Sequence, residues 1–464
     1  MLIFIVTLVL ILWRPRGVRE VWFALAGAVA MLLTGSVDGA DVRALFAETA
    51  PVLVFLAGML VVGYVADQAG VFLWLAQHTA RLSNGDGRRL FVGLYAVGVF
   101  VTVWFSLDTT AVILAPIVFN LVRVLGVPPL PFVLATTYVA NTASLLLPVS
   151  NLTNLIVWNR FHIPFWSFAA AMALPALAAI AVNLLLFLWL FRRDIPHHFI
   201  LQPAVAPPGT IGGSGAAAGA LGAAGRVPGR PGAGGLASGA ETAGAELGAA
   251  GEGAAAGGRR LTECLILLGV LLAALAAAPF FGWELWAVAV AGGLALTLHA
   301  AARGELELRR LVTGISWDLL PFVFSLFLVL RGVGKSGLTE LLTAVLVPAD
   351  AGDTFLGLLR VAVATALGSN LINNLPMVLV AVDSLTAPVA AGQVGMGSVY
   401  AALLGTNLGP NLTVIGSLAT MLALSIIGGK GLRVSGTLYL KIGLVTVPLL
   451  LLGSVLGLWL ALHV

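Results

Sequence analysis

Two short segments of this sequence combine asparagine, threonine and serine with helix-breaking residues in otherwise apolar surroundings. One covers residues 141–154 and the other residues 405–417, and each contains a proline. Proline and glycine leave backbone carbonyls and amides unpaired, which is tolerated at membrane depth only against protein or a water-filled cavity. Each segment therefore predicts a re-entrant hairpin or a broken helix that ends in an uncharged polar cradle.

The side chains in these cradles donate and accept hydrogen bonds without carrying charge, which suits a small hydroxylated solute. A single Ser, Thr or Asn in a membrane helix more often joins two helices. Two clusters at corresponding positions favour a binding site instead. Together with the asparagines before Pro376, the candidate substrate-binding residues are Asn141, Thr142, Ser144, Ser150, Asn151, Thr153, Asn154, Asn370, Asn373, Asn374, Thr406, Asn407, Asn411 and Thr413.

Asp108 is the candidate for proton coupling. It lies between two largely apolar stretches, residues 101–107 and 111–122. A carboxylate inside a membrane span costs about 2.5–3.5 kcal/mol on insertion scales and is usually functional. Loss of hydration favours its protonated form, as a proton carrier requires. The alternative is an aspartate that caps a helix at the membrane edge.

Long apolar elements must position these residues. The 464 residues are 60% hydrophobic and only 9% charged, with a mean hydropathy of +1.05. Soluble domains carry about 25% charged residues, and an apolar run of about 20 residues spans a bilayer. The sequence therefore predicts an all-α polytopic membrane protein with roughly 10–12 spans, in contact with the lipid bilayer.

The positive charge of the chain reflects its orientation in the membrane. The net charge is +4, and arginines occur in short clusters beside apolar runs, such as Arg88–Arg89, Arg192–Arg193 and Arg259–Arg260. Such clusters mark cytoplasmic loops, so no nucleic-acid partner is expected. Residues 1–13 read as a first span and not as a cleaved signal, because no basic region precedes them. Arg14 and Arg16 follow this span, so its start is expected outside the cell.

Residues that would support enzyme chemistry are few. A single cysteine, Cys264, excludes an intrachain disulfide and a thiolate metal cluster. The histidines have no second metal ligand in range, and no phosphate-binding loop occurs. We expect no cofactor, no metal and no enzymatic activity.

The chain is expected to contain two related halves, residues 1–194 and 261–464. Residues 195–260 are rich in Gly, Ala and Pro and predict a disordered cytoplasmic linker. Pro116 and Asn151 are separated by as many positions as Pro376 and Asn411. Internal repeats with interrupted helices are typical of secondary transporters. We therefore expect two inverted repeats with broken helices and re-entrant hairpins, the latter around residues 128–160 and 395–427.

In these segments the chain resembles the arsenite efflux permeases, the arsenical-pump membrane proteins of the ion-transporter superfamily. The resemblance runs through most of both halves and is densest at residues 84–88, 108–118, 141–152, 191–196, 373–376 and 408–420. It implies a scaffold domain and a transport domain in the bacterial cytoplasmic membrane. It also implies export of arsenite and antimonite, driven by the membrane potential or a proton gradient. Further partners to consider are a soluble arsenite-stimulated ATPase and a second copy in a homodimer.

The sequence departs from that family pattern at three positions. Asn141 and Asn407 stand where arsenite permeases tend to carry aspartate, and Asn411 stands where they tend to carry lysine. The cradles are therefore uncharged, which leaves Asp108 as the coupling candidate. Arsenous acid is a small neutral trihydroxy molecule at cellular pH, so amides and hydroxyls suit it without charge compensation.

Two other functions remain open. A sodium-coupled carboxylate or anion transporter, or a sodium/proton antiporter of the same superfamily, could use the same asparagines and free carbonyls to hold Na⁺. A channel is the second alternative, although paired breaks at the midplane favour a closed, alternating site.

Overall fold

The computed structural model describes residues 2–13, 15, 18–199, 243–304, 306, 308–334, 343–347 and 353–463, with only the backbone given for residues 243–258. Every regular element in these ranges is helical. The expectation of an all-α polytopic protein is confirmed.

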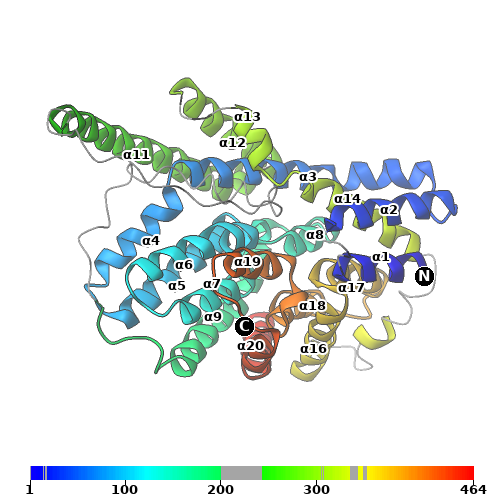
Figure 1. Cartoon of the computed structure of the whole chain (residues 1–464). Coiled ribbons are helices and arrows are strands. Elements are labelled where there is room, and N and C mark those ends of the chain that lie inside the picture. Colours follow the sequence, from blue (N-terminus) through cyan, green and yellow to red (C-terminus); the bar gives the residue numbers. More distant parts are fainter. Residues whose placement is uncertain are drawn as a thin grey trace.

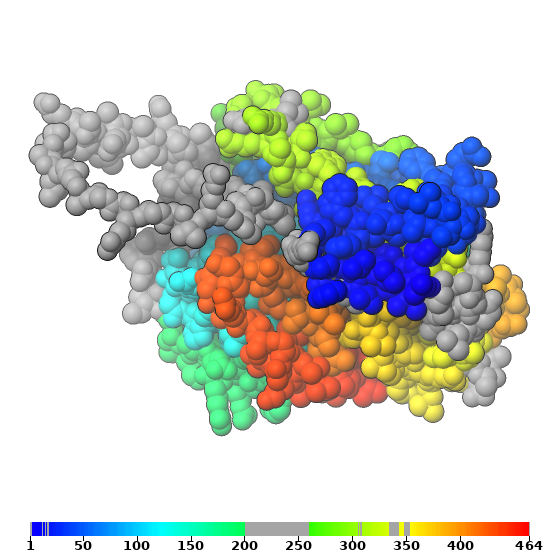
Figure 2. All heavy atoms as spheres, turned by 45° about the vertical axis from the view of Figure 1, so that its right-hand side comes forward, coloured from blue at the N-terminus to red at the C-terminus, as the bar shows by residue number. Residues whose placement is uncertain are grey.

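One group contains the first helices of each half, and we call it the scaffold group. These helices are α1 (Leu2–Trp13), α2 (Glu20–Leu33), α3 (Gly39–Gln68), α11 (Ala243–Phe281), α12 (Leu285–Ala302), the short α13 (Leu308–Gly314) and α14 (Leu319–Gly334). Helix α3 packs against α12, and α2 packs against α14, so the first and second halves interlock. Figure 1 shows α13, α11, α12 and α3 in the upper part of the view, with most of the other helices below them. Figure 2 shows the N-terminal helices beside residues of the second half.

The second group surrounds the candidate site. In the first half it contains α4 (Val71–Leu82), α5 (Gly87–Trp104), η2 (Thr109–Leu114), α6 (Ala115–Val124), α7 (Pro129–Ala143), η3 (Pro148–Ser150), α8 (Leu152–Arg160) and α9 (Phe165–Leu190). In the second half it contains α16 (Phe355–Ile372), α17 (Asn374–Ala390), α18 (Met396–Leu408), η4 (Gly409–Asn411), η5 (Val414–Gly416), α19 (Leu418–Gly429) and α20 (Gly436–His463).

The cytoplasmic end of the molecule can be assigned from its basic loops. The Phe199 amide donates to the Gly85 carbonyl at 2.8 Å, which brings the loop after α9 to the loop before α5. Arg260 Nη2 donates to the Gln68 carbonyl at the end of α3 (2.9 Å). The arginine clusters before α5 and after α9 therefore lie close together, and the cluster at the start of α11 lies at the end of α3. The positive-inside rule places all three in the cytoplasm.

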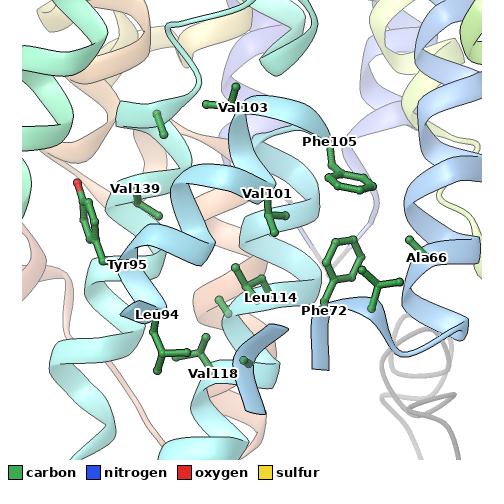
Figure 3. Packing of buried hydrophobic residues seen from close by; sticks show 14 of the residues in the cluster. Ala66, Phe72, Leu94, Tyr95, Val101, Val103, Phe105, Leu114, Val118 and Val139 are labelled. Atoms are coloured by element: carbon green, nitrogen blue, oxygen red, sulfur yellow. The ribbon is translucent and has the colours of Figure 1, made fainter. Parts of the chain in front are cut away.

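The chain reverses direction at two re-entrant hairpins. In Figure 3, Leu94 lies beside Val118 and Val101 beside Leu114, so α5 and α6 run antiparallel and the chain turns between Trp104 and Thr109. In the second half, a Cβ atom on Gly368 would lie 2.3 Å from the Met377 sulfur, so α16 and α17 also fold back. The re-entrant hairpins therefore occupy residues 87–124 and 355–390.

The pair α7–α8 crosses the membrane as one interrupted helix. Phe132 of α7 contacts Phe91 in the first turns of α5, at the cytoplasmic end (ring centroids 5.3 Å apart). Arg160, in the last turn of α8, pairs with Glu48 in the half of α3 far from its cytoplasmic end (3.3 Å). The segment around residues 128–160, predicted as a hairpin, is therefore a broken crossing helix.

The pair α18–α19 crosses in the opposite direction. Gly397 in the first turn of α18 lies against Asp353, beside the start of α16. At the other end, Arg123 Nη1 at the cytoplasmic end of α6 donates to the Lys430 carbonyl after α19 (3.3 Å). The predicted hairpin around residues 395–427 is again a broken helix. Composition marks where a helix is interrupted, but whether the chain then reverses depends on tertiary packing.

The two halves form inverted repeats. Among the described residues, each half contains five elements that run between the two ends of the molecule, namely α1, α2, α3, α7–α8 and α9 in the first half and α11, α12, α14, α18–α19 and α20 in the second. An odd number of crossings gives the halves opposite orientations. In the part of the chain that the structure describes, seven helices are long and apolar enough to span a membrane by themselves. Two of these, α5 and α16, are arms of the re-entrant hairpins.

The expected linker lies mostly outside the described residues. Residues 200–242 are not described, while residues 195–199 lie against the α4–α5 loop and α11 begins at Ala243. The division into two halves joined by a disordered linker stays a prediction.

Candidate functional site

The two broken helices meet at their interruptions, where asparagines of one helix bond to asparagines of the other. Asn141 Nδ2 donates to Asn411 Oδ1 (2.8 Å), and Asn407 Nδ2 donates to Asn154 Oδ1 (2.8 Å). Asn151 Nδ2 donates to Asn407 Oδ1 (3.0 Å). None of these five side chains is more than 3% exposed. We call these five residues the central amide cluster.

Local helix geometry aims these side chains at each other. Asn151 is the N-cap of α8, and its Oδ1 accepts from the Thr153 amide (3.2 Å). The Thr153 hydroxyl then donates to Asn407 Oδ1 in the last turn of α18 (2.7 Å). Asn154 Nδ2 closes the break itself, donating to the Ser144 carbonyl at 2.6 Å. The end of one half-helix and the start of another therefore supply both sides of the cluster.

One group in the cluster is left unpaired. Among the described residues, Asn411 Nδ2 is buried without a hydrogen-bond partner. A buried amide donor without a partner costs about 1–3 kcal/mol, and an unpaired group of this kind marks a place for a water or ligand oxygen. The cluster therefore presents a donor at its centre.

A second cluster joins the tip of the α16–α17 hairpin to the α18–α19 break. Asn370 Nδ2 donates to the Gly409 carbonyl (2.8 Å), and the Thr413 hydroxyl donates to Asn370 Oδ1 (2.7 Å). Asn373 Nδ2 donates to the Ile415 carbonyl (3.1 Å). Asn373 has a φ of +74°, a strained conformation that is typical of functional sites. Asn374, the first residue of α17, is buried beside it.

Asp108 lies at the tip of the other hairpin. It immediately precedes η2 and is partly exposed. Among the described residues, its carboxylate has no hydrogen-bond or ion-pair partner. Its neighbour Phe105 packs edge-on against Phe72 of α4, with ring centroids 5.3 Å apart, and Ala66 of the scaffold helix α3 lies close by (Figure 3). The tip carrying Asp108 is therefore in contact with the scaffold.

Three predicted site residues point away from the central cluster. The Thr142 hydroxyl donates to the Tyr138 carbonyl (3.0 Å), and that of Thr406 donates to the Leu403 carbonyl (3.1 Å). The Ser150 hydroxyl donates to the Val103 carbonyl (2.7 Å), which joins the α7–α8 break to the neighbouring hairpin. Ser144 remains at the edge of the cluster, where its hydroxyl accepts from Asn151 Nδ2 (3.3 Å). The two threonines therefore bond within their own helices, and only the two serines link the α7–α8 break to its surroundings.

The structure also revises the pairing between the repeats. Asn151 caps α8, but the corresponding cap of α19 is Ser417, with similar backbone angles. Asn411 ends the short helical turn η4 instead. The two asparagines have the same spacing from their prolines and lie at corresponding breaks, α7–α8 and α18–α19. Their structural roles at these breaks differ.

Sequence reasoning missed two contributors to this region. Thr420 accepts from Asn141 Nδ2 at 3.3 Å. Asn183, fully buried within α9, donates to the Tyr95 hydroxyl (3.0 Å) and to the Thr142 hydroxyl oxygen (3.4 Å). In the sequence, Asn183 is a single amide residue within an apolar run, and this feature could have identified it.

Comparisons with known proteins agree with this architecture. Residues 8–406 match the family described as citrate transporter. The chain is 30% identical to the arsenical pump membrane protein of Escherichia coli K12, over 97% of this chain and 95% of the relative. The protein of that name from Yersinia enterocolitica is also 30% identical, with the same coverage.

A solved structure supports the fold. The YdaH transporter of Alcanivorax borkumensis, described as having an unusual topology, aligns with a TM-score of 0.56 over 99% of this chain and 98% of its own. At 16% identity, this similarity concerns the fold alone. The resemblance to arsenical-pump membrane proteins is confirmed, and the chain is a multi-pass membrane protein with bacterial relatives. The chain therefore belongs to the citrate transporter family of membrane transporters and is similar over nearly its whole length to the arsenical pump membrane proteins.

Proposed function

We propose that this transporter exports arsenite and antimonite as neutral trihydroxy species. The observation that carries the proposal is the uncharged central amide cluster at the crossing of the two broken helices. Support also comes from the relatives named arsenical pump membrane protein, with which the chain aligns over nearly its whole length.

The chemistry of the cluster matches such a solute. As(OH)₃ has three hydroxyls, each able to donate and to accept, and the cluster offers amide and hydroxyl groups of both kinds. The buried Asn411 Nδ2 supplies a donor that no protein group uses among the described residues. Each hydrogen bond within the cluster contributes only about 0.5–1.5 kcal/mol net. Bonds to the solute can therefore replace those between the asparagines at little net cost in free energy.

Asp108 is the proposed carrier of the coupling proton. It is partly exposed at a hairpin tip and, among the described residues, its carboxylate has no hydrogen-bond or ion-pair partner. The amides of the central cluster cannot titrate. A carboxylate that is protonated from outside and releases its proton inside would couple export to the proton gradient.

Sodium-coupled carboxylate transport is the second candidate, favoured by the description of the matching family as citrate transporter. Carboxylates are usually bound by arginine or lysine in charge-assisted hydrogen bonds. The side chains that meet at the two breaks are amides and hydroxyls, which fits a neutral solute better. A soluble arsenite-stimulated ATPase and a second copy of the chain are proposed as partners.

Uptake into everted membrane vesicles tests the proposal. We expect saturable arsenite accumulation that a protonophore abolishes and that neither Na⁺ nor excess citrate changes. Citrate uptake that requires Na⁺, without arsenite uptake, would contradict the proposal and favour the second candidate. Arsenite flux that does not saturate would favour a channel.

A further inference from the structure

A buried tyrosine on α20 lies beside the central amide cluster and bonds to none of its members. The Tyr439 side chain is fully buried, and among the described residues its hydroxyl has no hydrogen-bond partner. Its ring packs against that of Tyr138 in α7, with the centroids 5.1 Å apart, so the hydroxyl is held in place. A buried hydroxyl without a partner is unfavourable by itself and marks a position for a water or a ligand oxygen.

Two contacts place this hydroxyl next to the cluster. The Thr420 hydroxyl lies close to that of Tyr439 but not in hydrogen-bonding geometry. Thr420 also accepts from Asn141 Nδ2 (3.3 Å), and the same amide donates to Asn411 Oδ1 (2.8 Å). One turn further along α20, a Cβ atom on Gly443 would lie 2.7 Å from the Asn411 carbonyl oxygen. Residues four apart share a helix face, so Tyr439 and Asn411 lie on the same side of the site.

The position of Tyr439 along α20 puts it on the cytoplasmic side of the cluster. Helix α20 begins after the loop in which the Lys430 carbonyl accepts from Arg123, at the cytoplasmic end of α6. Tyr439 lies in the first turn of α20, one turn before Gly443, which faces Asn411. The Tyr439 hydroxyl is therefore nearer to the cytoplasm than the contact with Asn411, on the side from which an exported solute enters.

We propose that the Tyr439 hydroxyl is a further binding group for the transported solute, an inference that rests on the proposed function. Asn411 Nδ2 and the Tyr439 hydroxyl are both buried and, among the described residues, unpaired. The amide nitrogen can only donate, whereas the phenol can donate and accept. One hydroxyl of As(OH)₃ can accept from the amide while a second donates to the phenol oxygen. Such a site discriminates against solutes without hydroxyls, because they leave its buried polar groups unpaired.

Equilibrium binding of radiolabelled arsenite and thermal unfolding, both with the purified full-length chain, test this proposal. Tyr439→Phe removes the hydroxyl and keeps the ring that packs against Tyr138. We expect the arsenite affinity to fall about three- to ten-fold, the contribution of one neutral hydrogen bond. The unfolding temperature without arsenite should not fall, because the hydroxyl makes no hydrogen bond to the described residues that the substitution could remove.

The matched control is Ser454→Ala, which removes another buried hydroxyl of α20 that has no partner among the described residues. Ser454 lies about 22 Å farther along the helix, so this variant should bind arsenite like the wild type. An unchanged affinity or a lower unfolding temperature in Tyr439→Phe, or an equal loss of affinity in Ser454→Ala, would overturn the proposal and leave the proposed function standing. Absence of arsenite binding by the wild type would instead contradict the proposed function itself, and this inference with it.

Discussion

At the scale of single residues, the site depends on which amides face each other across the two breaks. Sequence could identify the asparagines as unusual in apolar helices, and the structure brings Asn141, Asn151, Asn154, Asn407 and Asn411 together. Sequence could not predict that the Thr142 and Thr406 hydroxyls bond to their own helices. Serine and threonine in helices can bond either to a preceding carbonyl or across an interface, and only packing decides between these partners.

Asn151→Ala and Asn411→Ala should each abolish arsenite export and leave membrane abundance near wild type. Each substitution removes one buried hydrogen-bonding group, worth about 1–3 kcal/mol. That loss is small for a protein of this size but large for the affinity of a small solute. The matched control is Asn120→Ala, which changes an exposed asparagine on α6 and should transport normally. Wild-type rates in both cluster variants would mean that these amides only hold the helices together.

Asp108→Asn should separate binding from coupling. The amide mimics the protonated carboxyl, so the variant should still bind and exchange arsenite down its gradient. It should not accumulate arsenite against a gradient, and its transport rate should not vary with pH, because the titrating group is gone. The measurement is arsenite uptake in everted vesicles across a pH series. Accumulation with an unchanged pH profile would assign coupling to another group and make Asp108 a structural cap.

At the scale of elements, the positions of the interruptions were predictable and their geometry was not. Proline and glycine within the segments 141–154 and 405–417 do mark breaks. The polar stretches before Pro116 and Pro376 mark re-entrant tips instead. Both kinds of segment have similar compositions, and the difference arises from contacts between distant elements. The bond from Ser150 to the Val103 carbonyl and that from Asn370 to the Gly409 carbonyl are examples.

The end of α8 forms a contact between a broken helix and the scaffold. Arg160 pairs with Glu48 (3.3 Å), and Asn159 Nδ2 donates to the Glu48 carbonyl (3.2 Å). Arg160→Glu should slow arsenite export several-fold, because two carboxylates would then face each other at this contact. Combining it with Glu48→Arg should restore the rate. Arg160→Gln should have a small effect, since a partly exposed pair contributes only about 0.2–1 kcal/mol. A charge swap that does not recover transport would exclude this pairing from the transport cycle.

At the scale of the whole molecule, the inverted halves explain how a solute could have access from either side. The first hairpin enters from the cytoplasmic end and the second from the opposite end, while the broken helices cross in opposite directions. Such symmetry permits two related conformations that expose the same central residues to alternate sides. Sequence indicated the repeat through its spacing of proline and asparagine, but the count of five crossings per half required the structure.

Deletion of residues 205–240 should leave transport intact. These residues are mostly Gly, Ala and Pro and have few large side chains to bury. Arsenite export and membrane abundance of the deletion variant should both match the wild type, and a variant with the same residues replaced by a Gly/Ser linker of equal length provides the control. A deletion that inserts normally but does not transport, while the control does, would assign a length-dependent role to this segment.

Equilibrium binding of arsenite to the purified chain tests the central claim most directly. The claim is that the amides at the crossing of the two broken helices bind a neutral trihydroxy solute. We predict saturable binding of radiolabelled arsenite, which unlabelled antimonite displaces and citrate does not. Asn407→Ala should weaken arsenite binding at least ten-fold, a factor that corresponds to about 1.4 kcal/mol of binding free energy. Unchanged arsenite affinity in Asn407→Ala, or displacement of arsenite by citrate, would contradict the claim.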